Sequence, residues 1–396
     1  MNRLTARWAT TAGPNRDTVF SATGVWPLLA FLADAADGPA RGELEDAVGM
    51  RAAEAAAAAR ELMSALATVR GSRSAVGLWV GPTLPLHESW VAGLPADTLG
   101  VFSGDAEADR RTLDMWAADR TDGLIDAMPI HLDDSVLLVP AAAQALRLKW
   151  LQPFWEGDML PEAGPWAGRC LLALRRETSL LDRIGVAETA SGPLTVLKVL
   201  GDTGVDVHLL LGDHDMAPSD VLQAGIGVLA GTYRTVPGDL LPLGESGPGL
   251  EVRTVRSRSP APTLSVRTSP FRLTGEHDLL KQPAVFGLST AVDDRYGHFP
   301  GISTEPLAIG SARQSAVAVF DAKGFEAASV TAIGAVGGVG PPPGYLSRRI
   351  YAEFDRPFGF LTVHRTSRLV LTAGWVAEPV PYPDDEPYGE AYDEAE

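Results

Sequence analysis

The sequence predicts an α+β fold. Stretches with helical spacing and stretches with strand patterning follow one another without the regular strand–helix–strand rhythm of a doubly wound parallel sheet. The chain has 396 residues, of which 45% are hydrophobic and 21% charged, which is typical of a globular protein with a sizeable buried core. We therefore expect one large domain over residues 1–380, followed by an acidic tail over residues 381–396.

The first third of the chain is predicted to be mainly helical. Gly38 and Pro39 end an apolar stretch of helical spacing. The alanine content of residues 51–69 strongly favours a helix, and alternation over residues 74–80 indicates a strand. The elements expected in this part are a strand at 18–21, helices at 26–35, 41–48 and 51–69, a strand at 74–80 and a short helix at 112–119.

The remainder is predicted to be mainly β-structure. Residues 136–139 form a continuous apolar run, which suits a strand that is buried on both faces. The other elements expected here are strands at 207–211, 264–267 and 316–320, a helix at 276–286, and a closing hairpin of strands at 358–363 and 367–375.

The charge balance narrows the choice of partners. Asp and Glu number 50 and Lys and Arg 33, so the formal net charge is −17. Such a surface repels phosphate backbones and anionic headgroups, and we expect neither a nucleic-acid nor a membrane partner. The tail at 381–396 is rich in Asp, Glu, Pro and Tyr, a composition that predicts a disordered, solvated segment.

The cysteine content and the N-terminal residues indicate the cellular compartment of the protein. Cys170 is the only cysteine, so no intramolecular disulfide can form, and we expect a buried structural thiol. Residues 1–16 lack the basic flank and apolar core of a secretory leader. No run approaches the roughly 18 apolar residues of a membrane span. We expect a soluble, cytoplasmic monomer, with secretion left open.

Patterns that could indicate a cofactor or metal site are better explained as ordinary structure. The glycines within 225–231 resemble a stretched dinucleotide-binding fingerprint, but the preceding residues 218–224 look helical where the fingerprint needs a strand. The Asp-His-Asp run at 213–215 follows an apolar run and a glycine, which favours a polar turn. His277 and His298 lack the spacing of a helical zinc pair. We expect no cofactor, no metal and no catalytic residue.

Four blocks of motifs carry a resemblance to a known family. The first is Val-Phe-Ser at 19–21, an apolar helix, and Gly-Pro-Ala-Arg-Gly-Glu-Leu at 38–44; the second begins with Trp116 and Thr-Asp-Gly-Leu-Ile at 121–125. The second block continues with Leu-Leu-Val at 137–139, Leu-Lys-Trp at 148–150 and Pro-Phe at 153–154. The third block contains Ser-Pro-Phe at 269–271, Asp-Leu-Leu at 278–280, Phe-Gly-Leu at 286–288 and Phe-Pro-Gly-Ile-Ser at 299–303. The fourth block contains Phe320, Asp-Arg-Pro-Phe-Gly-Phe at 355–360 and Gly-Trp-Val-x-x-Pro at 374–379. Each block alone is weak, but the four in this order resemble a serpin, of the bacterial intracellular type, over nearly the whole chain.

The resemblance implies a serpin fold, with about nine helices, three β-sheets and a long exposed reactive-centre loop. It also implies that Ser21 and Trp150 lie at the shutter and the breach, the points where the main sheet of a serpin opens. The chain departs from the family pattern at Ala22, where serpins usually carry proline, and at residues 140–141, where Pro-Ala replaces the usual Asn-Ala pair.

In serpins the segment after the strand that ends here at Phe320 is the reactive-centre loop. A protease attacks it as a substrate, and its upstream half then inserts into the large sheet and carries the acyl-linked protease to the far pole. Insertion demands small residues that are compatible with a strand. The residues that the resemblance assigns to the hinge are Gly324, Phe325, Glu326, Ala327, Ala328, Ser329, Val330 and Thr331.

Most hinge residues suit insertion, but three features count against inhibition. Phe325 takes the first inserting position, where a phenyl ring needs space that a tightly packed sheet lacks. Ala322 replaces a usual glutamate. Pro357 also lies 33 positions after Gly324, which is farther than in the family, and slack in the loop would give the protease time to hydrolyse the acyl bond.

The length of the loop leaves two positions for the scissile bond. Counting forward from Gly324 gives Gly338–Val339, a poor anchor because glycine fills no specificity pocket. Counting back from Pro357 gives the bond between Leu346 and Ser347. Residues there that could anchor a chymotrypsin-like or trypsin-like enzyme, or flank such an anchor, are Tyr345, Leu346, Ser347, Arg348 and Arg349. The alternative for the two arginines is a solvated basic pair before a strand at 350–354.

Three functions remain open on the sequence. The hinge alanines favour a suicide inhibitor of serine or cysteine proteases, which would make a protease the partner. Phe325 and the loop length favour a non-inhibitory serpin that acts as a binding module or a protease substrate. A serpin scaffold recruited to enzymatic chemistry is the third, for which no residue stands out.

Overall fold

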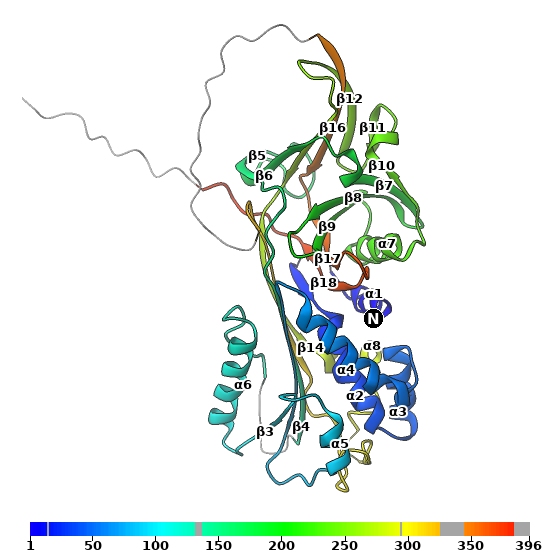
Figure 1. Ribbon diagram of the computed structural model, residues 1–396, viewed down its shortest axis with the longest axis vertical. Helices are drawn as coiled ribbons and strands as arrows, with labels where there is room; N and C mark the ends of the chain where they lie inside the picture. The colour runs from blue at the N-terminus through cyan, green and yellow to red at the C-terminus, as the bar shows by residue number, and fades with distance from the viewer. Residues whose placement is uncertain (14–15, 131–136, 294, 325–343, 384–396) are drawn as a thin grey trace, which may run out of the picture.

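Three β-sheets and eight α-helices are present in the part of the chain that the structure, a computed structural model, describes (Figure 1). The described residues are 1–13, 16–130, 137–293, 295–324 and 344–383. The predicted α+β class with three sheets is confirmed, with eight helices in the described residues against the nine or so expected.

Local sequence signals explain where the main helices begin and end. The side chain of Ser21 caps the second helix by accepting a hydrogen bond from the backbone of Gly24. The third helix ends at Gly49, which adopts the left-handed conformation with φ +75°. The helices are α1 (Asn2–Ala9), α2 (Ala22–Ala35), α3 (Gly38–Val48), α4 (Ala52–Thr68), α5 (Glu88–Gly93), α6 (Ala106–Arg120), α7 (Pro218–Ala230) and α8 (Pro283–Phe286).

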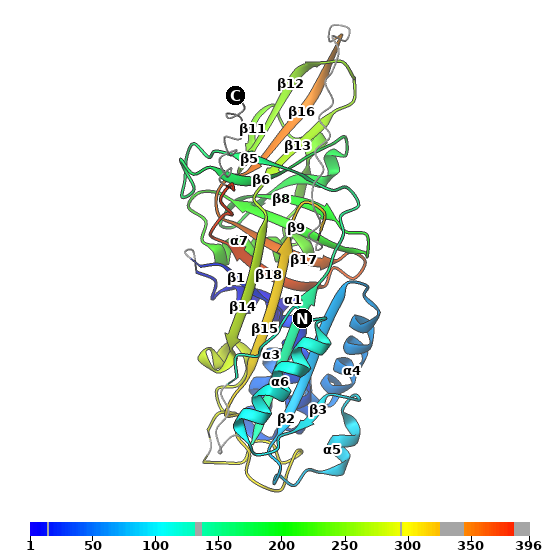
Figure 2. The ribbon, with the colours of Figure 1, turned by 90° about the vertical axis from the view of Figure 1, so that its left-hand side faces the viewer.

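A long five-stranded sheet runs through the lower part of the molecule, and two further sheets stack above it (Figures 1 and 2). The five-stranded sheet has the order β14 (Phe271–Asp278), β15 (Arg313–Phe320), β4 (Leu138–Leu146), β2 (Ser72–Val80) and β3 (Leu99–Val101). The seven-stranded sheet has the order β1 (Thr18–Phe20), β18 (Val370–Val376), β17 (Phe358–His364), β9 (Val205–Gly212), β8 (Gly192–Leu200), β7 (Ile184–Thr189) and β10 (Thr235–Pro237). The six-stranded sheet has the order β11 (Gly244–Gly247), β12 (Leu250–Ser257), β16 (Tyr345–Phe354), β13 (Thr263–Thr268), β6 (Leu171–Thr178) and β5 (Trp155–Met159).

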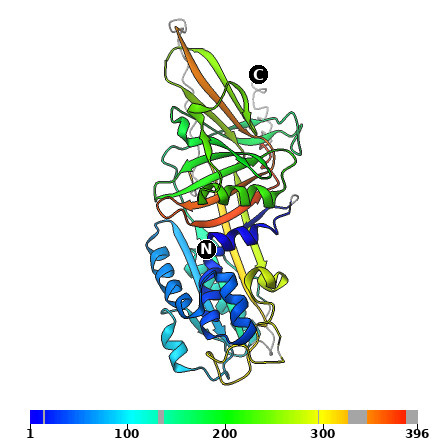
Figure 3. The ribbon, with the colours of Figure 1, turned by 90° about the vertical axis from the view of Figure 1, so that its right-hand side faces the viewer.

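Both faces of the five-stranded sheet are covered. Helices α2, α3 and α4 lie on one side of it and α6 on the other (Figure 1), and α7 lies against the seven-stranded sheet (Figure 3). Every residue of β4 is buried as a result. The main core extends from α2 through the sheets, and a smaller apolar cluster fills the space beneath α6.

The structure corrects three expectations. Residues 276–278 belong to strand β14 and not to a helix, because alternate residues of this strand are buried and all eight pair with β15. Cys170 was expected to be buried but is exposed, since it lies in the connection that leads into β6. The predicted tail begins at 381, but Tyr382 still donates a backbone hydrogen bond of 3.0 Å to the carbonyl of Cys170; residues 384–396 lie outside the described part.

Candidate functional site at the junction of β15 and β4

The five-stranded sheet contains a parallel junction at its centre. Strands β15 and β4 run parallel over five residue pairs, from Arg313–Ala141 to Val317–Ala145. On either side, β14 pairs with β15 and β4 pairs with β2 in the antiparallel sense. Parallel pairing is slightly less stable per residue than antiparallel pairing. A strand that entered between β15 and β4 in the opposite direction would therefore replace one parallel ladder with two antiparallel ladders.

Small side chains border this junction. Four of the five β4 residues that face β15 are alanines, at positions 141, 142, 143 and 145, and Ser315 and Ala316 lie opposite on β15. Such residues leave room for the backbone of another strand without a large change in side-chain packing.

The ladder between the two strands stops before β15 ends. Pairing with β4 ends at Val317, and β15 continues to Phe320. A small cavity of about 10 Å³ lies at this end. The residues that line it are Leu146, Leu148, Val207, Phe271, Ala318, Val319, Phe320, Phe360 and Thr362. The two strands thus part at the end nearest to the segment that follows β15, which we call the open end of the junction.

The chain turns back directly after β15. One carboxylate oxygen of Asp321 accepts hydrogen bonds from the backbone N–H groups of Lys323 (2.9 Å) and Gly324 (2.8 Å). Partial burial raises the pKa of this carboxyl group, while the two hydrogen bonds act in the opposite direction. Gly324 then pairs with Lys149 in the antiparallel sense, three residues beyond the end of β4. The described part of this segment therefore ends at the open end of the junction, paired antiparallel with a residue just beyond β4.

Gly324 is required for this turn. Its φ is +128°, and a β-carbon at this position would lie 2.0 Å from the carbonyl oxygen of Leu148. Backbone atoms cannot move aside as a flexible side chain does, so another residue here would displace the turn.

A cluster of rings holds the turn in place. The indole N–H of Trp150 donates to the carbonyl of Asp321 at 2.8 Å, and the ring lies 5.0 Å from that of Phe320. Phe154 packs on Phe320 and donates a backbone hydrogen bond of 2.7 Å to Ala322. These contacts put Trp150 beside the turn at the open end of the junction.

Hydrogen bonds hold the other end of the junction in place. The side-chain amide of Gln314 donates to the carbonyl of Ser21 at 2.6 Å and accepts from the Ser21 N–H at 2.9 Å. The hydroxyl of Ser21 donates to the carbonyl of Leu371 in β18 at 2.7 Å. Strand β15 is therefore tied through Ser21 to both α2 and the seven-stranded sheet. Sequence reasoning singled out Ser21 but missed Gln314, whose only signal is a polar residue in an otherwise small and apolar stretch.

The predicted hinge and cleavage residues fall into two groups. Gly324 is the part of the hinge that the structure describes; the other seven hinge residues (325–331) and the bond between Gly338 and Val339 lie outside the described residues. Tyr345, Leu346, Ser347, Arg348 and Arg349 lie in β16.

The position of the second cleavage region in β16 counts against cleavage there. Ser347 is buried and donates its hydroxyl to the carbonyl of Ala261, while Arg348 donates to the carbonyl of Gly238. Strand β16 pairs with β12 along residues 345–352. A protease binds its substrate as an accessible extended segment, and a strand paired in a sheet does not offer one. The alternative for Arg348 and Arg349, a basic pair leading into a strand, agrees better with this position.

The extra length of the loop also has a structural explanation. Strand β16 begins at Tyr345 and not at the predicted residue 350, so 20 residues (325–344) separate Gly324 from the next strand. Residues 345–349, which were counted as loop, therefore belong to β16.

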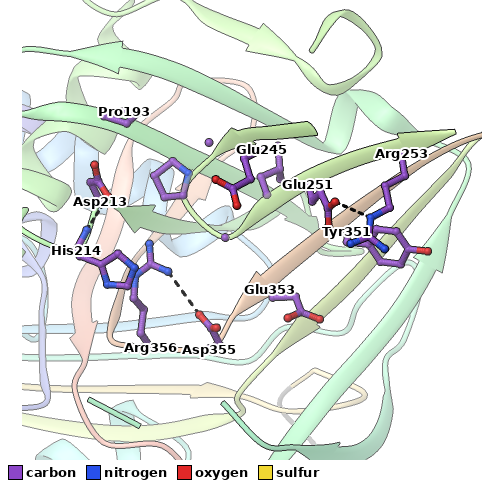
Figure 4. A pocket seen from close by; sticks show the side chains of 14 residues that line it. Pro193, Asp213, His214, Glu245, Glu251, Arg253, Tyr351, Glu353, Asp355 and Arg356 are labelled. Carbon is purple, nitrogen blue, oxygen red and sulfur yellow. Dashed lines mark hydrogen bonds and ion pairs between the residues drawn. The ribbon is translucent and has the colours of Figure 1, made fainter. Parts of the chain in front are cut away.

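A polar hollow of about 690 Å³ lies away from this site, between β12, β16 and the end of β9 (Figure 4). Arg253 pairs with Glu251 and Arg356 with Asp355 across its wall. The fourteen residues that line it include no Ser, Thr, Cys or Lys, but they include acidic side chains, one histidine and one tyrosine.

Metal-binding and membrane-spanning features are absent from the part of the chain that the structure describes. It contains no group of three or more His, Cys, Asp or Glu side chains placed to hold a metal ion. None of the described helices has the length and apolar character needed to cross a bilayer.

Comparisons with known proteins agree with this architecture. The family described as Serpin (serine protease inhibitor) matches residues 253–379. A putative serpin-Z6C from Oryza sativa subsp. japonica is 24% identical over 412 residues, covering 95% of this chain and 94% of the relative. Human thyroxine-binding globulin superposes with a TM-score of 0.71 at 15% identity, with 96% of each chain covered. The thermophilic serpin tengpin in its native state gives a TM-score of 0.71 at 13% identity, covering 95% of this chain and 92% of the other.

The three sheets, with the parallel β15–β4 junction at the centre of the five-stranded one, form the arrangement of the serpin fold. The family match and the full-length relative identify the family: the chain belongs to the serpins, and the solved serpins share its fold.

Proposed function

We propose that this serpin is a suicide inhibitor of serine or cysteine proteases. The observation that carries the proposal is the antiparallel pairing of Gly324 with Lys149 at the open end of the β15–β4 junction. The residues that follow Gly324 are mainly small, and the strand beside which they would lie is rich in alanine.

The proposed mechanism has two steps that occur in order, cleavage of the loop and insertion of its upstream half. The nucleophile of the protease attacks a loop carbonyl, the peptide bond breaks, the new amine leaves, and the protease stays attached through an ester or thioester. The freed upstream half then pairs between β15 and β4, which replaces the parallel ladder with two antiparallel ones. Inhibition requires that insertion be faster than hydrolysis of the acyl bond.

Incubation with trypsin, chymotrypsin, subtilisin and elastase tests the proposal. An inhibitor gives a protease complex that resists SDS, a released C-terminal fragment whose mass locates the cleaved bond, and a large rise in the melting temperature of the cleaved protein. Cleavage by each of these enzymes without any complex contradicts inhibition by this mechanism.

An Ala328→Arg variant separates insertion from cleavage. Both faces of β4 are buried, so an arginine in a strand inserted beside it would be an unpaired buried charge. We expect normal cleavage of A328R, no complex, and no rise in melting temperature. The control is Pro342→Arg, which adds the same charge beyond the hinge. Once this variant is fully cleaved, its melting temperature should still rise.

A second function is favoured by two residues. Phe325 and Ala322 depart from the inhibitory pattern, and both suit a serpin that acts as a binding module or a substrate. Such a protein would be cut but would form no complex, and its melting temperature would not change on cleavage. Replacing Phe325 with Thr would then leave the absence of a complex unchanged, whereas a complex gained by F325T would show that the ring alone prevents trapping.

A further inference from the structure

A second hollow, on the side of the molecule away from α6, has the features of a ligand site. It has a volume of about 640 Å³ and lies between the C-terminal half of α4, the start of α1 and the turn that joins β17 to β18 (Figures 1 and 3). Ligand pockets in proteins commonly have volumes of about 300–1,000 Å³. The residues that line it are Met1, Asn2, Leu62, Ala65, Leu66, Thr68, Val69, Arg70, Thr203, His364, Ser367, Leu369 and Leu371.

One part of the wall is apolar and well supported. Leu62, Leu66 and Val69 follow one another at positions i, i+4 and i+7 of α4 and the turn after it, so they share a face. Leu369 and Leu371 face them from β18 and the turn before it, and Leu371 is almost fully buried.

Three polar groups converge at the other part of the wall. Thr203 packs against the residue after Arg70: a β-carbon at Gly71 would lie 3.5 Å from the Thr203 methyl group. The carbonyl of Gly204, the next residue, accepts from the N–H of Arg365, which places His364 nearby. Arg70, Thr203 and His364 thus line the hollow from three neighbouring segments: the turn before β2, the β8–β9 turn and the end of β17.

Two of these groups are unused within the described structure. The Thr203 hydroxyl oxygen is buried and has no hydrogen-bond partner there. A buried hydroxyl without a partner is unfavourable, and a small movement of the wall would let a ligand oxygen satisfy it. Arg70 is exposed and has no hydrogen bond or ion pair with another described residue. No Asp or Glu lines the hollow, although the chain has 50 acidic residues against 33 basic ones.

We propose that this hollow binds a small amphipathic monocarboxylate, such as a fatty-acid anion of about ten to fourteen carbons. The hydrocarbon chain lies against Leu62, Leu66 and Leu371, and the carboxylate accepts hydrogen bonds from the exposed guanidinium of Arg70. The apolar wall excludes small polar anions, and the cationic end selects an acid over an alcohol or an amine of the same length.

Calorimetric titration of the full chain with dodecanoate, below its micellar concentration, tests the proposal. We expect saturable binding of one molecule per chain, with dodecanol and dodecylammonium bound at least tenfold more weakly and acetate not bound. Equal binding of the three dodecyl probes, or no saturable binding of dodecanoate, would overturn it.

Matched substitutions locate the site. Ala65→Trp fills the mouth of the hollow and should abolish binding, whereas Ala67→Trp, exposed on the same helix but outside the lining, should not. Arg70→Gln should weaken dodecanoate at least tenfold and leave dodecanol unchanged, because only the charge-assisted hydrogen bonds are lost. All three positions are exposed, so the folded protein should be retained, which the far-UV circular dichroism spectrum checks. Binding that is unaffected by A65W, or weakened equally by A67W, would contradict the assignment.

Discussion

Gly324 is the residue on which the turn after β15 depends most directly. Its φ is positive, and a β-carbon placed on it would lie only 2.0 Å from the carbonyl oxygen of Leu148, which leaves no room for a side chain. We expect Gly324→Ala to lower the free energy of unfolding by about 1–3 kcal/mol, through backbone strain and displacement of the turn. Urea unfolding measures this change. Gly344→Ala is the control, because a β-carbon there meets nothing within 4 Å; equal stability of the two variants would show that the turn is not under this constraint.

His208 gives the protein a pH-dependent stability. Burial, together with the nearby Lys198, lowers the pKa of His208 to about 4, against an ordinary value of 6.5. Between these values the unfolded chain binds a proton that the folded protein does not, so stability falls as the pH drops from 6.5 to 4. The loss attributable to this side chain approaches about 3 kcal/mol near the lower of the two pKa values.

A His208→Gln variant checks this contribution. Urea unfolding at about pH 7, 6, 5 and 4 should show a shallower decline for H208Q than for the natural protein. His277, whose pKa burial also lowers, is present in both proteins and contributes equally to both curves. Parallel curves for the two proteins would contradict a titrating His208.

Single residues show where sequence reasoning reached its limit. The resemblance drew attention to Ser21, Trp150 and Gly324, all of which border the β15–β4 junction. It did not reveal Gln314, because the predicted strand began at residue 316 and left this side chain outside. It also suggested cleavage at residues that belong to β16, because a count along the chain cannot tell a longer loop from a longer strand.

At the scale of elements, local patterns predicted most of the fold. The alanine-rich helix expected at 51–69 is α4 (Ala52–Thr68), and the strand expected at 18–21 is β1 (Thr18–Phe20). The failures involve pairing between segments far apart in the chain. The last three residues of β14, 276–278, were assigned to a helix because their pairing with β15 cannot be read from the local pattern. Strand β12 was not predicted, although it supplies eight pairs to β16.

The pairing of β12 with β16 predicts resistance to proteolysis. Arg348 and Arg349 are trypsin sites by sequence, but both lie in the paired part of β16. Proline at Thr254 or at Val255 in β12 should expose them, because adjacent backbone N–H groups of a strand point to opposite sides and one of the two faces β16.

Limited trypsin digestion, read by mass spectrometry, compares the two variants. We expect new cleavage after Arg348 or Arg349 in the variant whose proline removes a donor to β16, and much less in the other. Rapid cleavage at these arginines in the natural protein would show that β16 does not protect them.

For the whole molecule, the central question is whether the main sheet can open. Five parallel pairs and the hydrogen bonds between Gln314 and Ser21 must break before a strand can enter. The gain is a sheet with antiparallel pairing on both sides of the new strand. The small side chains along β4 and the short length of the ladder keep the cost of opening low. The helix α6 presents few buried residues to the sheet, which makes it the more easily displaced of the two covers.

A reversible cross-link between β15 and β4 tests this mechanical requirement. Ser315 and Ala143 are direct partners across the junction, so cysteines at both positions, with the natural Cys170 replaced by serine, place two thiols on adjacent strands. The oxidised protein should still be cleaved in its loop, but it should form no SDS-resistant complex and gain no thermal stability, because the strands cannot separate. Reduction should restore both properties in the same sample, which separates the cross-link from the substitutions. A complex formed in full by the oxidised protein would mean that trapping does not pass through the β15–β4 junction.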